Sequence, residues 1–407
     1  MPWKETDAMQ ERVRFALEWE RRWDAAKGGR VDVAELCRRF GISRQTGYVW
    51  IKRFCDAGHD VRALEEKSKR PLTTPTAVEL EMEDLVVAAR KLHPRWGPRK
   101  LRAWLQHRYP GSCFPSASCM SKILQRRGLS RPRKRRRRKG EPLTKPFGDC
   151  TAPNDTWCID FKGKFRTRDG HWCHILTLLD AWSRYLLRCE VVLDPDGDAV
   201  ERILDSAFQE FGLPLAMRSD NGPPFASTGA AGLTSLSVWW LQLGIRLERI
   251  EPGEPQQNGR LERAHLTLEE IVSTPATDAA AQQRQLDPWR REYNEERPHE
   301  ALGQRPPAHL YEPSQRRYPR KLLRPQPQSW TDVCRVENDG SIRWRHRKLH
   351  VTNALIGEYV ELERVSETRW EVRYGEIVLG TLNTENMQHG MIRRRMRIAE
   401  VSGMSVG

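Results

Sequence analysis

The chain has 407 residues, which is long enough for roughly two to four folded units rather than one ordinary domain. Lys and Arg outnumber Asp and Glu by 69 to 54, and the resulting net charge of +15 favours a polyanionic partner, above all nucleic acid. Nine cysteines without a CxxC pair argue against a disulfide framework, and no apolar run reaches the length of about 18 residues that a membrane span needs. We therefore expect a soluble, cytoplasmic, nucleoid-associated protein that binds DNA and no membrane.

A helix-turn-helix is predicted within residues 1–70, the first of the folded units. Asp32 can cap a short helix, Gly41 allows a tight turn, and Ser43 can cap a second helix. The residues expected to point inward from the second helix are Val49, Trp50 and Phe54. The outward face, which would enter the major groove of DNA, comprises Arg44, Gln45, Thr46, Tyr48 and Lys52. A helical hairpin without a role in DNA binding is the alternative.

A second unit that resembles a helix-turn-helix is predicted over residues 71–130. Its helices are expected at residues 78–92 and 99–108, and a third helix begins after Ser116 or Ser118.

A basic linker is predicted over residues 131–149. A run of like charge stays extended until an anion neutralises it, so this segment is expected to follow DNA phosphates. The residues concerned are Arg133, Lys134, Arg135, Arg136, Arg137 and Arg138. A merely solvated tether between domains is the alternative.

From residue 150 the sequence alternates between apolar strands and amphipathic helices, which predicts an α/β domain over residues 150–311. The expected strands are residues 156–161, 174–180, 185–193, 215–218 and 245–250. The expected helices are residues 199–211, 236–243 and 259–272. Three neighbouring strands, followed by alternating helices and strands, predict a mixed sheet flanked by helices.

A Pro- and Arg-rich linker over residues 312–330 leads into a small β-barrel-like domain, predicted over residues 331–400 from several short alternating stretches. The residues of this domain that could contact DNA are Arg343, Trp344, Arg345, Arg347 and Lys348. An inert, stabilising domain is the alternative.

Three acids of the α/β domain stand out by their surroundings. Asp160 lies in the otherwise apolar TWCIDF strand, where an acid must be paired, protonated or metal-bound unless it sits at an exposed strand edge. Asp220 follows a strand end in MRSDNGPPF, a place where ligands bind but also where turn acids are common. Glu262 lies in the first turn of a helix, where a capping role is the alternative. Taken singly, none of the three establishes an enzyme.

Other acids of this domain are interpreted structurally. Asp180 is expected to be a turn residue whose carboxylate pairs with Arg184. Helix capping is expected of the group Asp194, Asp196 and Asp198, because no Ca²⁺-binding loop pattern follows them.

The spaced motifs TWCIDF, RSDNGPPF and PQQNGRLER resemble the catalytic core of retroviral integrases and of the related DDE transposases of bacterial insertion sequences. The segment YNEERPHEALGQRPPAHLY resembles the end of that core in the bacterial transposases, so the resemblance covers residues 150–311. No His/Cys zinc module precedes the core, which favours the bacterial branch. The resemblance implies an RNase H-like α/β fold with Asp160, Asp220 and Glu262 as catalytic residues. Glu254 is the competing third acid, but it precedes PQQNG instead of following it.

The resemblance also implies two Mg²⁺ (or Mn²⁺) ions per active site, with Asp160 bound to both ions and Asp220 and Glu262 to one each. The residues implied to shape the loops around the metal and the DNA ends are Asn221, Gly222, Gln257, Asn258 and Gly259.

The chain departs from the family pattern at two points. Glu269 stands where related transposases often carry a basic residue, and Arg260 or Arg263 is expected to contact DNA in its place. The spacing between Asp220 and Glu262 exceeds the usual integrase spacing, so the small-residue stretch ASTGAAGLTSLS is expected to loop out of the core.

These features predict a transposase. The helix-turn-helix units would bind the inverted repeats at the element ends, and the core would cut a strand at each end and join the resulting 3′-OH to target DNA, without a covalent protein–DNA intermediate. Pairing two ends implies a homo-oligomer on double-stranded DNA, at least a dimer. The alternatives are a metal-dependent nuclease that does not join DNA and an inactive DNA-binding regulator, against which the presence of all three acids argues.

Overall fold

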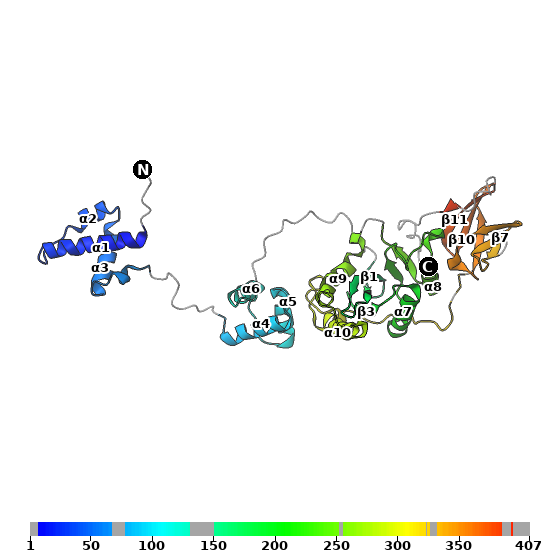
Figure 1. Ribbon diagram of the computed structural model, residues 1–407, viewed down its shortest axis with the longest axis horizontal. Coiled ribbons are helices and arrows are strands. Elements are labelled where there is room, and N and C mark those ends of the chain that lie inside the picture. Colours follow the sequence, from blue (N-terminus) through cyan, green and yellow to red (C-terminus); the bar gives the residue numbers. More distant parts are fainter. Residues whose placement is uncertain are drawn as a thin grey trace. The chain divides into compact units, whose positions relative to one another are not determined.

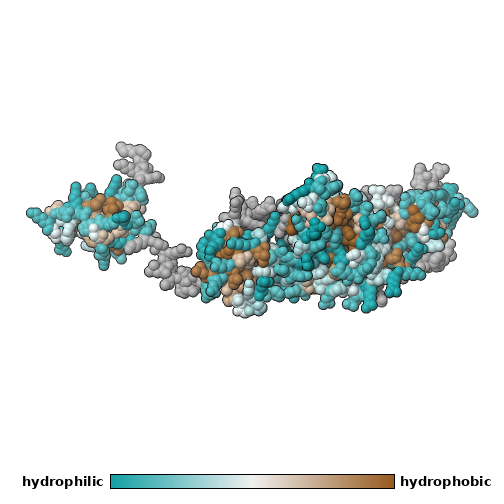
Figure 2. Space-filling model, turned by 60° about the horizontal axis from the view of Figure 1, so that its bottom comes forward, coloured by the Kyte–Doolittle hydropathy of each residue, from teal (hydrophilic) through white to brown (hydrophobic). Residues whose placement is uncertain are grey.

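The computed structural model describes residues 7–66, 78–130, 150–251, 255–322, 324–325, 332–384 and 392–393 of the chain. It divides into two compact units, Met1–Ala77 and Val78–Gly407, each of which is described by itself. The basic linker, including Arg133, Lys134, Arg135, Arg136, Arg137 and Arg138, lies outside the described residues, as does Glu254. Polar residues cover most of the face shown in Figure 2. In the part of the chain that is described, no helix has the length and apolar character to cross a membrane.

The first unit contains the predicted helix-turn-helix. Its elements are α1 (Ala8–Ala25), α2 (Val33–Arg39), α3 (Arg44–Asp56) and the 3-10 turn η1 (Val61–Leu64). As expected, the Asp32 carboxylate caps α2, the Ser43 hydroxyl caps α3, and Gly41 between them has a φ of +67°. Helix α1, for which no prediction is made from the sequence, packs Phe15 and Trp19 into the same core.

The inward face of α3 differs from the prediction. Phe54 is fully buried as expected, but Val49 is 47% exposed, so its predicted inward position is wrong. Ile51 and Gly47 face the core instead, because they precede Phe54 by three and seven residues and therefore share its helix face. A side chain at position 47 would collide with the sulfur of Cys37, which explains the glycine there.

The second unit begins with the three predicted helices. These are α4 (Leu80–Leu92), α5 (Pro98–Arg108) and α6 (Ala117–Arg126). The Ser116 hydroxyl caps α6 by accepting a hydrogen bond from the Cys119 N–H at 3.2 Å, which decides between the two predicted caps. Pro98 fills the first position of α5, where a missing N–H has no consequence. The buried core of this part includes Val86, Trp96, Leu101, Leu105, Met120 and Leu124.

The α/β domain is built on a mixed five-stranded sheet, as predicted. Its strands are β1 (Thr156–Arg166), β2 (Trp172–Asp180), β3 (Leu186–Val192), β4 (Ala216–Ser219) and β5 (Arg246–Arg249). Their spatial order is β3-β2-β1-β4-β5. Strand β2 is antiparallel to both β1 and β3, whereas β4 runs parallel to both β1 and β5. Strand β1 is therefore central, with an antiparallel and a parallel neighbour.

Helices cover both faces of this sheet (Figure 1). The helices α7 (Gly197–Phe211) and α8 (Ser235–Gln242) pack on one face, and α9 (Gly259–Val272) and α10 (Ala279–Arg291) on the other. Successive side chains of a strand point to opposite faces. Trp157 and Ile159 of β1 accordingly join the core with α7, whereas Cys158 joins the core with α9. Asp160, two residues after Cys158, is thereby directed toward α9.

The closing segment of the domain runs along the outer edge of β3. Helix α10 continues into a π-helical turn, η4 (Glu292–Glu296), and two 3-10 turns follow, η5 (Glu300–Leu302) and η6 (Pro307–His309). The side chain of Gln283 donates to the Cys189 carbonyl, and that of Asn294 bonds the backbone of Leu186. Side chains thus occupy the backbone groups that a further strand would otherwise pair with.

The C-terminal part forms the predicted small β domain. Its elements are β6 (Val333–Arg335), β7 (Ser341–Trp344), β8 (Arg347–His350), η7 (Asn353–Leu355), β9 (Tyr359–Arg364), β10 (Arg369–Tyr374), β11 (Ile377–Asn383) and β12 (Ile392–Arg393). One sheet has the order β12-β11-β10-β9-β6, and β7 pairs with β8.

The stretch ASTGAAGLTSLS does not loop out into solvent. Ala230 and Ala231 are buried in the 3-10 turn η2 (Ala230–Gly232), which packs against β11. On α8, the buried Gln242 amide donates to the Tyr374 hydroxyl at 3.3 Å. The small residues allow two backbones to approach closely, so the insertion joins the α/β core to the β domain.

The basic hairpin β7–β8 is largely engaged within the β domain. Trp344 is buried against Trp370, and both Arg343 and Lys348 pair with Glu337. These contacts support the stabilising alternative for most of the hairpin. Arg343, Arg345 and Arg347 are all exposed, and the Arg345 guanidinium lies over the rings of Trp344 and Trp370.

Candidate active site

Asp160 lies on the central strand and faces α9. Its side chain is 27% exposed, so the carboxylate is partly removed from water. Strand register places Asp160 opposite Thr177 of β2, whose hydroxyl donates to the main-chain carbonyl of Asp160 at 3.0 Å. The strand thus holds the acid at a fixed place between sheet and helix.

Asp220 comes directly after β4, the parallel neighbour of β1. Its carboxylate accepts a hydrogen bond from the Gly222 N–H at 3.2 Å, as in an Asx turn. Glycine suits position 222 because a Cβ there would lie only 3.2 Å from the carboxylate oxygen Oδ2 of Asp220. The Asn221 side chain donates to the Ile250 carbonyl, which fastens this loop to the end of β5.

Glu262 lies in the first turn of α9 and is exposed. On a helix, residues three and seven positions apart share a face, so Glu262, His265 and Glu269 lie on one side of α9. This helix packs against β1, the strand that carries Asp160.

The negative charges of Asp220 and Glu262 act on the carboxyl group of Asp160. Burial, followed by the negative charges of Asp220 and Glu262, raises the pKa of Asp160 to about 7, against the lowering effects of the Phe161 N–H and Lys162. As they stand, no three His, Cys, Asp or Glu side chains among the described residues are gathered tightly enough to hold a metal ion.

Two further residues near Asp160 were not singled out from the sequence. The His265 ring places Nδ1 at 4.0 Å from Asp160 Oδ2 and Nε2 at 2.7 Å from Thr177 Oγ1. Burial, and then the positive charge of Lys162, lowers the pKa of His265 to about 4, so the imidazole is neutral at physiological pH. Helical spacing from Glu262 was the signal that could have identified this histidine.

Lys162 is the second residue that the sequence analysis missed. It lies two residues after Asp160, on the same face of β1, and its Nζ is 2.8 Å from Glu269 Oε2. The acid at position 269 is therefore matched by a lysine on the strand. At this end of the site β1, and not α9, supplies the positive charge.

The two arginines expected to contact DNA differ in orientation. The guanidinium of Arg260 donates to the Ala181 carbonyl at 2.7 Å, and burial lowers its pKa. Arg263 is exposed on α9. The geometry therefore leaves Arg263, and not Arg260, open to a large ligand.

The loop before α9 is held by its own polar groups. Gln257 accepts a hydrogen bond from the Glu251 N–H at 2.9 Å, and its carbonyl accepts one from Arg218 at 3.1 Å. Asn258 is buried, and its Oδ1 finds no hydrogen-bond partner among the described residues. Gly259 then opens α9. These residues set the path of the chain into the helix that carries Glu262.

Asp180 lies outside the acid site, and its expected pairing with Arg184 is wrong. The fully buried carboxylate accepts hydrogen bonds from the Asn154 N–H and from the N–H and hydroxyl of Ser183. The Arg184 guanidinium instead donates to main-chain carbonyls, including that of Ala181. A buried carboxylate needs hydrogen-bond donors, and Asn154 and Ser183 provide them.

The helix-capping interpretation is confirmed for Asp196, which accepts a hydrogen bond from the Ala199 N–H at the start of α7.

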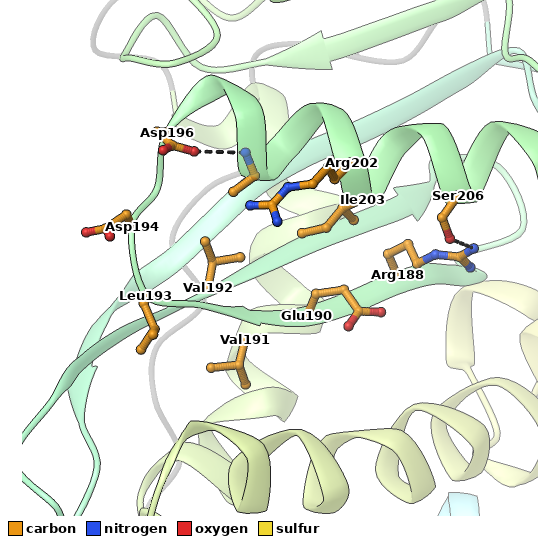
Figure 3. A pocket seen from close by; sticks show the side chains of 11 residues that line it. Arg188, Glu190, Val191, Val192, Leu193, Asp194, Asp196, Arg202, Ile203 and Ser206 are labelled. Carbon is orange, nitrogen blue, oxygen red and sulfur yellow. Dashed lines mark hydrogen bonds between the residues drawn. The ribbon is translucent and has the colours of Figure 1, made fainter.

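A cavity of about 620 Å³ lies between β3 and α7, but it contains none of the three acids (Figure 3). Its most buried cation, Arg188, donates to the Ser206 hydroxyl at 2.9 Å and pairs with Glu210 at 2.6 Å. Asp196 and Arg202 bond to backbone groups of α7, and the cavity, which contains none of the three acids, is not the candidate site.

All five residues of α3 that were expected to face DNA are exposed: Arg44, Gln45, Thr46, Tyr48 and Lys52. Tyr48 is the most notable, with 58% of its surface open although it is large and aromatic. The surface of α3 is therefore free to meet a ligand.

Family models match both parts of this architecture. Models of the integrase core domain match residues 151–255 and 243–307. A helix-turn-helix domain model matches residues 19–71, and a homeodomain-like domain model matches residues 46–124. Fold and site thus define a helix-turn-helix protein with an integrase-type core.

Relatives that match more than half of the chain narrow this class. An uncharacterized 39.2 kDa protein of insertion element IS476 from Xanthomonas euvesicatoria is 31% identical over 60% of this chain and 68% of its own length. An uncharacterized 31.7 kDa protein of insertion element IS407 from Burkholderia multivorans is 30% identical over 54% and 79%. The catalytic core of HTLV-2 integrase in complex with magnesium is a weaker likeness, 13% identical with a TM-score of 0.32, over 40% of this chain and 98% of that one. The chain belongs to the transposases of bacterial insertion sequences within the retroviral integrase superfamily, which confirms the resemblance inferred from its motifs.

Proposed function

We propose that this protein is a DDE transposase that binds the inverted repeats at its element's ends and catalyses metal-dependent DNA cleavage and strand transfer. Membership of the insertion-sequence family supports the overall role. The observation that carries the catalytic assignment is the placement of the three acids. Asp160 lies on β1, Asp220 directly follows the neighbouring strand β4, and Glu262 lies on α9, which packs against β1. These acids come from a strand, a loop and a helix, and only the fold brings their charges to bear on one another.

The donor set fits Mg²⁺ or Mn²⁺. Such cations take oxygen ligands and retain water, so one or two carboxylates suffice to bind each ion. Asp160 and Asp220 would provide the fixed ligands, and Glu262 would complete the set from α9. When bound, a pair of ions activates the attacking hydroxyl and stabilises the leaving oxygen. A cation would also offset the repulsion that raises the pKa of Asp160.

The residues of this chain would bind the metal ions and orient the DNA, while water and a DNA 3′-OH are the nucleophiles. Asp160 is held by the central strand, and Asp220 by its turn with Gly222. In the first step, water attacks phosphorus and breaks the bond to the 3′ oxygen at an element end. In the second, that 3′-OH attacks a target phosphodiester in line, forms a new bond to its phosphorus and displaces the 3′ oxygen of the target strand, so no protein–DNA bond is formed.

The DNA partner would be bound mainly outside the core. Helix α3 presents an exposed polar face with two cations, Arg44 and Lys52, and the chain carries a net charge of +15. The basic linker over residues 131–149 would follow phosphates between the domains. Pairing two DNA ends requires at least two copies of the chain.

The test uses a plasmid that carries the gene together with its native flanking DNA. Purified full-length protein with Mg²⁺ or Mn²⁺ should yield joined products whose junctions fall at inverted repeats. Asp160→Asn, Asp220→Asn and Glu262→Gln should each abolish joining and keep binding to the flanking DNA. Cleavage without joined products would instead support a nuclease, and binding without either would support an inactive regulator.

A further inference from the structure

Asp160 is connected to α9 through a chain of hydrogen bonds. The Thr177 hydroxyl donates to the main-chain carbonyl of Asp160 at 3.0 Å. A hydroxyl has one proton, so its oxygen can only accept from the His265 Nε2, which lies 2.7 Å away. Nε2 must therefore carry a hydrogen, and the ring is fixed in orientation by this bond. These two hydrogen bonds connect α9 to β2, and β2 to the backbone of β1.

The direct approach of His265 to the carboxylate is looser. Its Nδ1 lies 4.0 Å from Asp160 Oδ2, which exceeds hydrogen-bond distance. His265 is nonetheless only 7% exposed and wedged between the helix and the two central strands. It lies three residues after Glu262, on the same helix face. One side chain thus links the helix carrying the third acid to the strand carrying the first.

We infer that His265 is a positioning residue that acts through Thr177 to hold Asp160, and with it the spacing between β1 and α9, in the arrangement that binds the divalent cation. This role rests on the proposed metal-dependent function. In this assignment His265 binds neither DNA nor metal, and it acts by fixing the positions of the acids. Outer-shell hydrogen bonds of this kind change metal affinity by about 10- to 100-fold in other metal sites.

The test compares variants that separate the hydrogen bond from the bulk of the ring. In His265→Gln the side-chain amide reaches the Nε2 position and can donate to Thr177, whereas in His265→Asn it is too short to do so. Thr177→Val removes the hydroxyl with little change of volume, and Thr177→Ser retains it. Thr381→Val, at a buried threonine of β11, is the matched control.

The readout is Mn²⁺ affinity of the full-length protein, measured by electron paramagnetic resonance well below the unfolding temperature. Thr177→Val and His265→Asn should weaken Mn²⁺ binding about tenfold or more. Thr177→Ser should bind Mn²⁺ more tightly than Thr177→Val, and His265→Gln should bind it more tightly than His265→Asn. Thr381→Val should match the wild type. A merely structural role would lower thermal stability in all variants without this ordering.

The outcomes separate this inference from the proposed function. Wild-type protein that binds no Mn²⁺ overturns both. Wild-type protein that binds Mn²⁺ through Asp160, with His265→Asn and Thr177→Val binding equally well, overturns the positioning role alone. Equal losses in His265→Gln and His265→Asn would also overturn it, because the Nε2 donor would then be irrelevant.

Discussion

The carboxamide of Asn294 exchanges two hydrogen bonds with the backbone of Leu186. The Leu186 N–H donates to Oδ1 at 2.8 Å, and Nδ2 donates to the Leu186 carbonyl at 3.0 Å. A neighbouring strand would make the same pair of bonds, so the amide substitutes for a strand at the edge of the sheet. Asn294 lies in the YNEERPH segment, and this contact gives that part of the motif a structural purpose.

Asn294→Ala should destabilise the α/β domain by about 3 kcal/mol, because it leaves a buried donor and a buried acceptor of β3 without partners. Urea unfolding followed by tryptophan fluorescence measures the change. Gln209→Ala removes an exposed amide from α7 and should have little effect. An equal response of the two variants would contradict the edge-capping role.

Asp160→Asn should remove the stabilisation that Mg²⁺ gives to the protein. A ligand that binds only the folded state raises its stability as RT ln(1 + [L]/Kd), so the wild type should unfold at a higher temperature when Mg²⁺ is added. The variant lacks the central carboxylate and should show little rise. Asp198→Asn, an exposed acid of α7 on the opposite face of the sheet, should keep the wild-type response in differential scanning fluorimetry.

The sequence predicted the sheet and its helices well because strand alternation, turn residues and caps are local signals. The contacts around Asp160 could not be predicted from such local signals. The bond between Thr177 and His265 spans 88 residues of sequence, and no local pattern reports it. The face of α3 was misjudged at Val49 because Gly47, with no apolar side chain, marks the true inward position. The insertion at Ala230 could not be placed, since its partner surface is a β domain that follows much later in the chain.

Acidification should destabilise the closing segment of the core through His299. Burial, followed by the charges of Lys100 and Arg297, lowers the pKa of His299 to about 3. In the unfolded chain the histidine takes up a proton near its ordinary pKa of 6.5. The stability that neutral His299 supports is therefore present above that pH and is lost as pH falls from about 6.5 toward 3.

His299→Phe retains a ring against Tyr293 and cannot be protonated, so it should flatten the pH dependence of the urea midpoint in that window. His346→Asn, in the exposed β7–β8 turn, should leave the profile as it is. If the wild type and His299→Phe lose stability in parallel, another group is responsible.

Glu269→Lys should strengthen DNA binding by the core. The change removes the partner of Lys162 and adds a positive charge beside it, and each further phosphate contact steepens the dependence of log K on log salt by about 0.9. Fluorescence anisotropy with a labelled duplex over a range of KCl concentrations provides the slope. Glu201→Lys makes the same change of charge on α7, on the other face of the sheet, and serves as the control. Identical slopes for the two variants would show that the effect on DNA binding does not depend on a charge near the three acids.

Tyr48→Ala should weaken recognition of the flanking DNA without affecting folding. The side chain is 58% exposed, so its loss should leave the unfolding temperature unchanged, while loss of a base contact costs on the order of tenfold in affinity. Leu17→Ala truncates a 46% exposed residue of α1 in the same unit and serves as control. Gel-shift titrations should show reduced preference over an unrelated duplex for Tyr48→Ala alone.

The capped edge of β3 has a consequence for the newly made chain. Leu186 leaves the ribosome 108 residues before Asn294. At about 5–20 residues per second, the edge of that strand stays uncovered for about 5 to 20 s of synthesis. During this interval an apolar strand with open N–H and carbonyl groups can pair with another nascent chain. Truncation before α10 would make this exposure permanent, so shortened forms of the core should accumulate as aggregates rather than as folded domains.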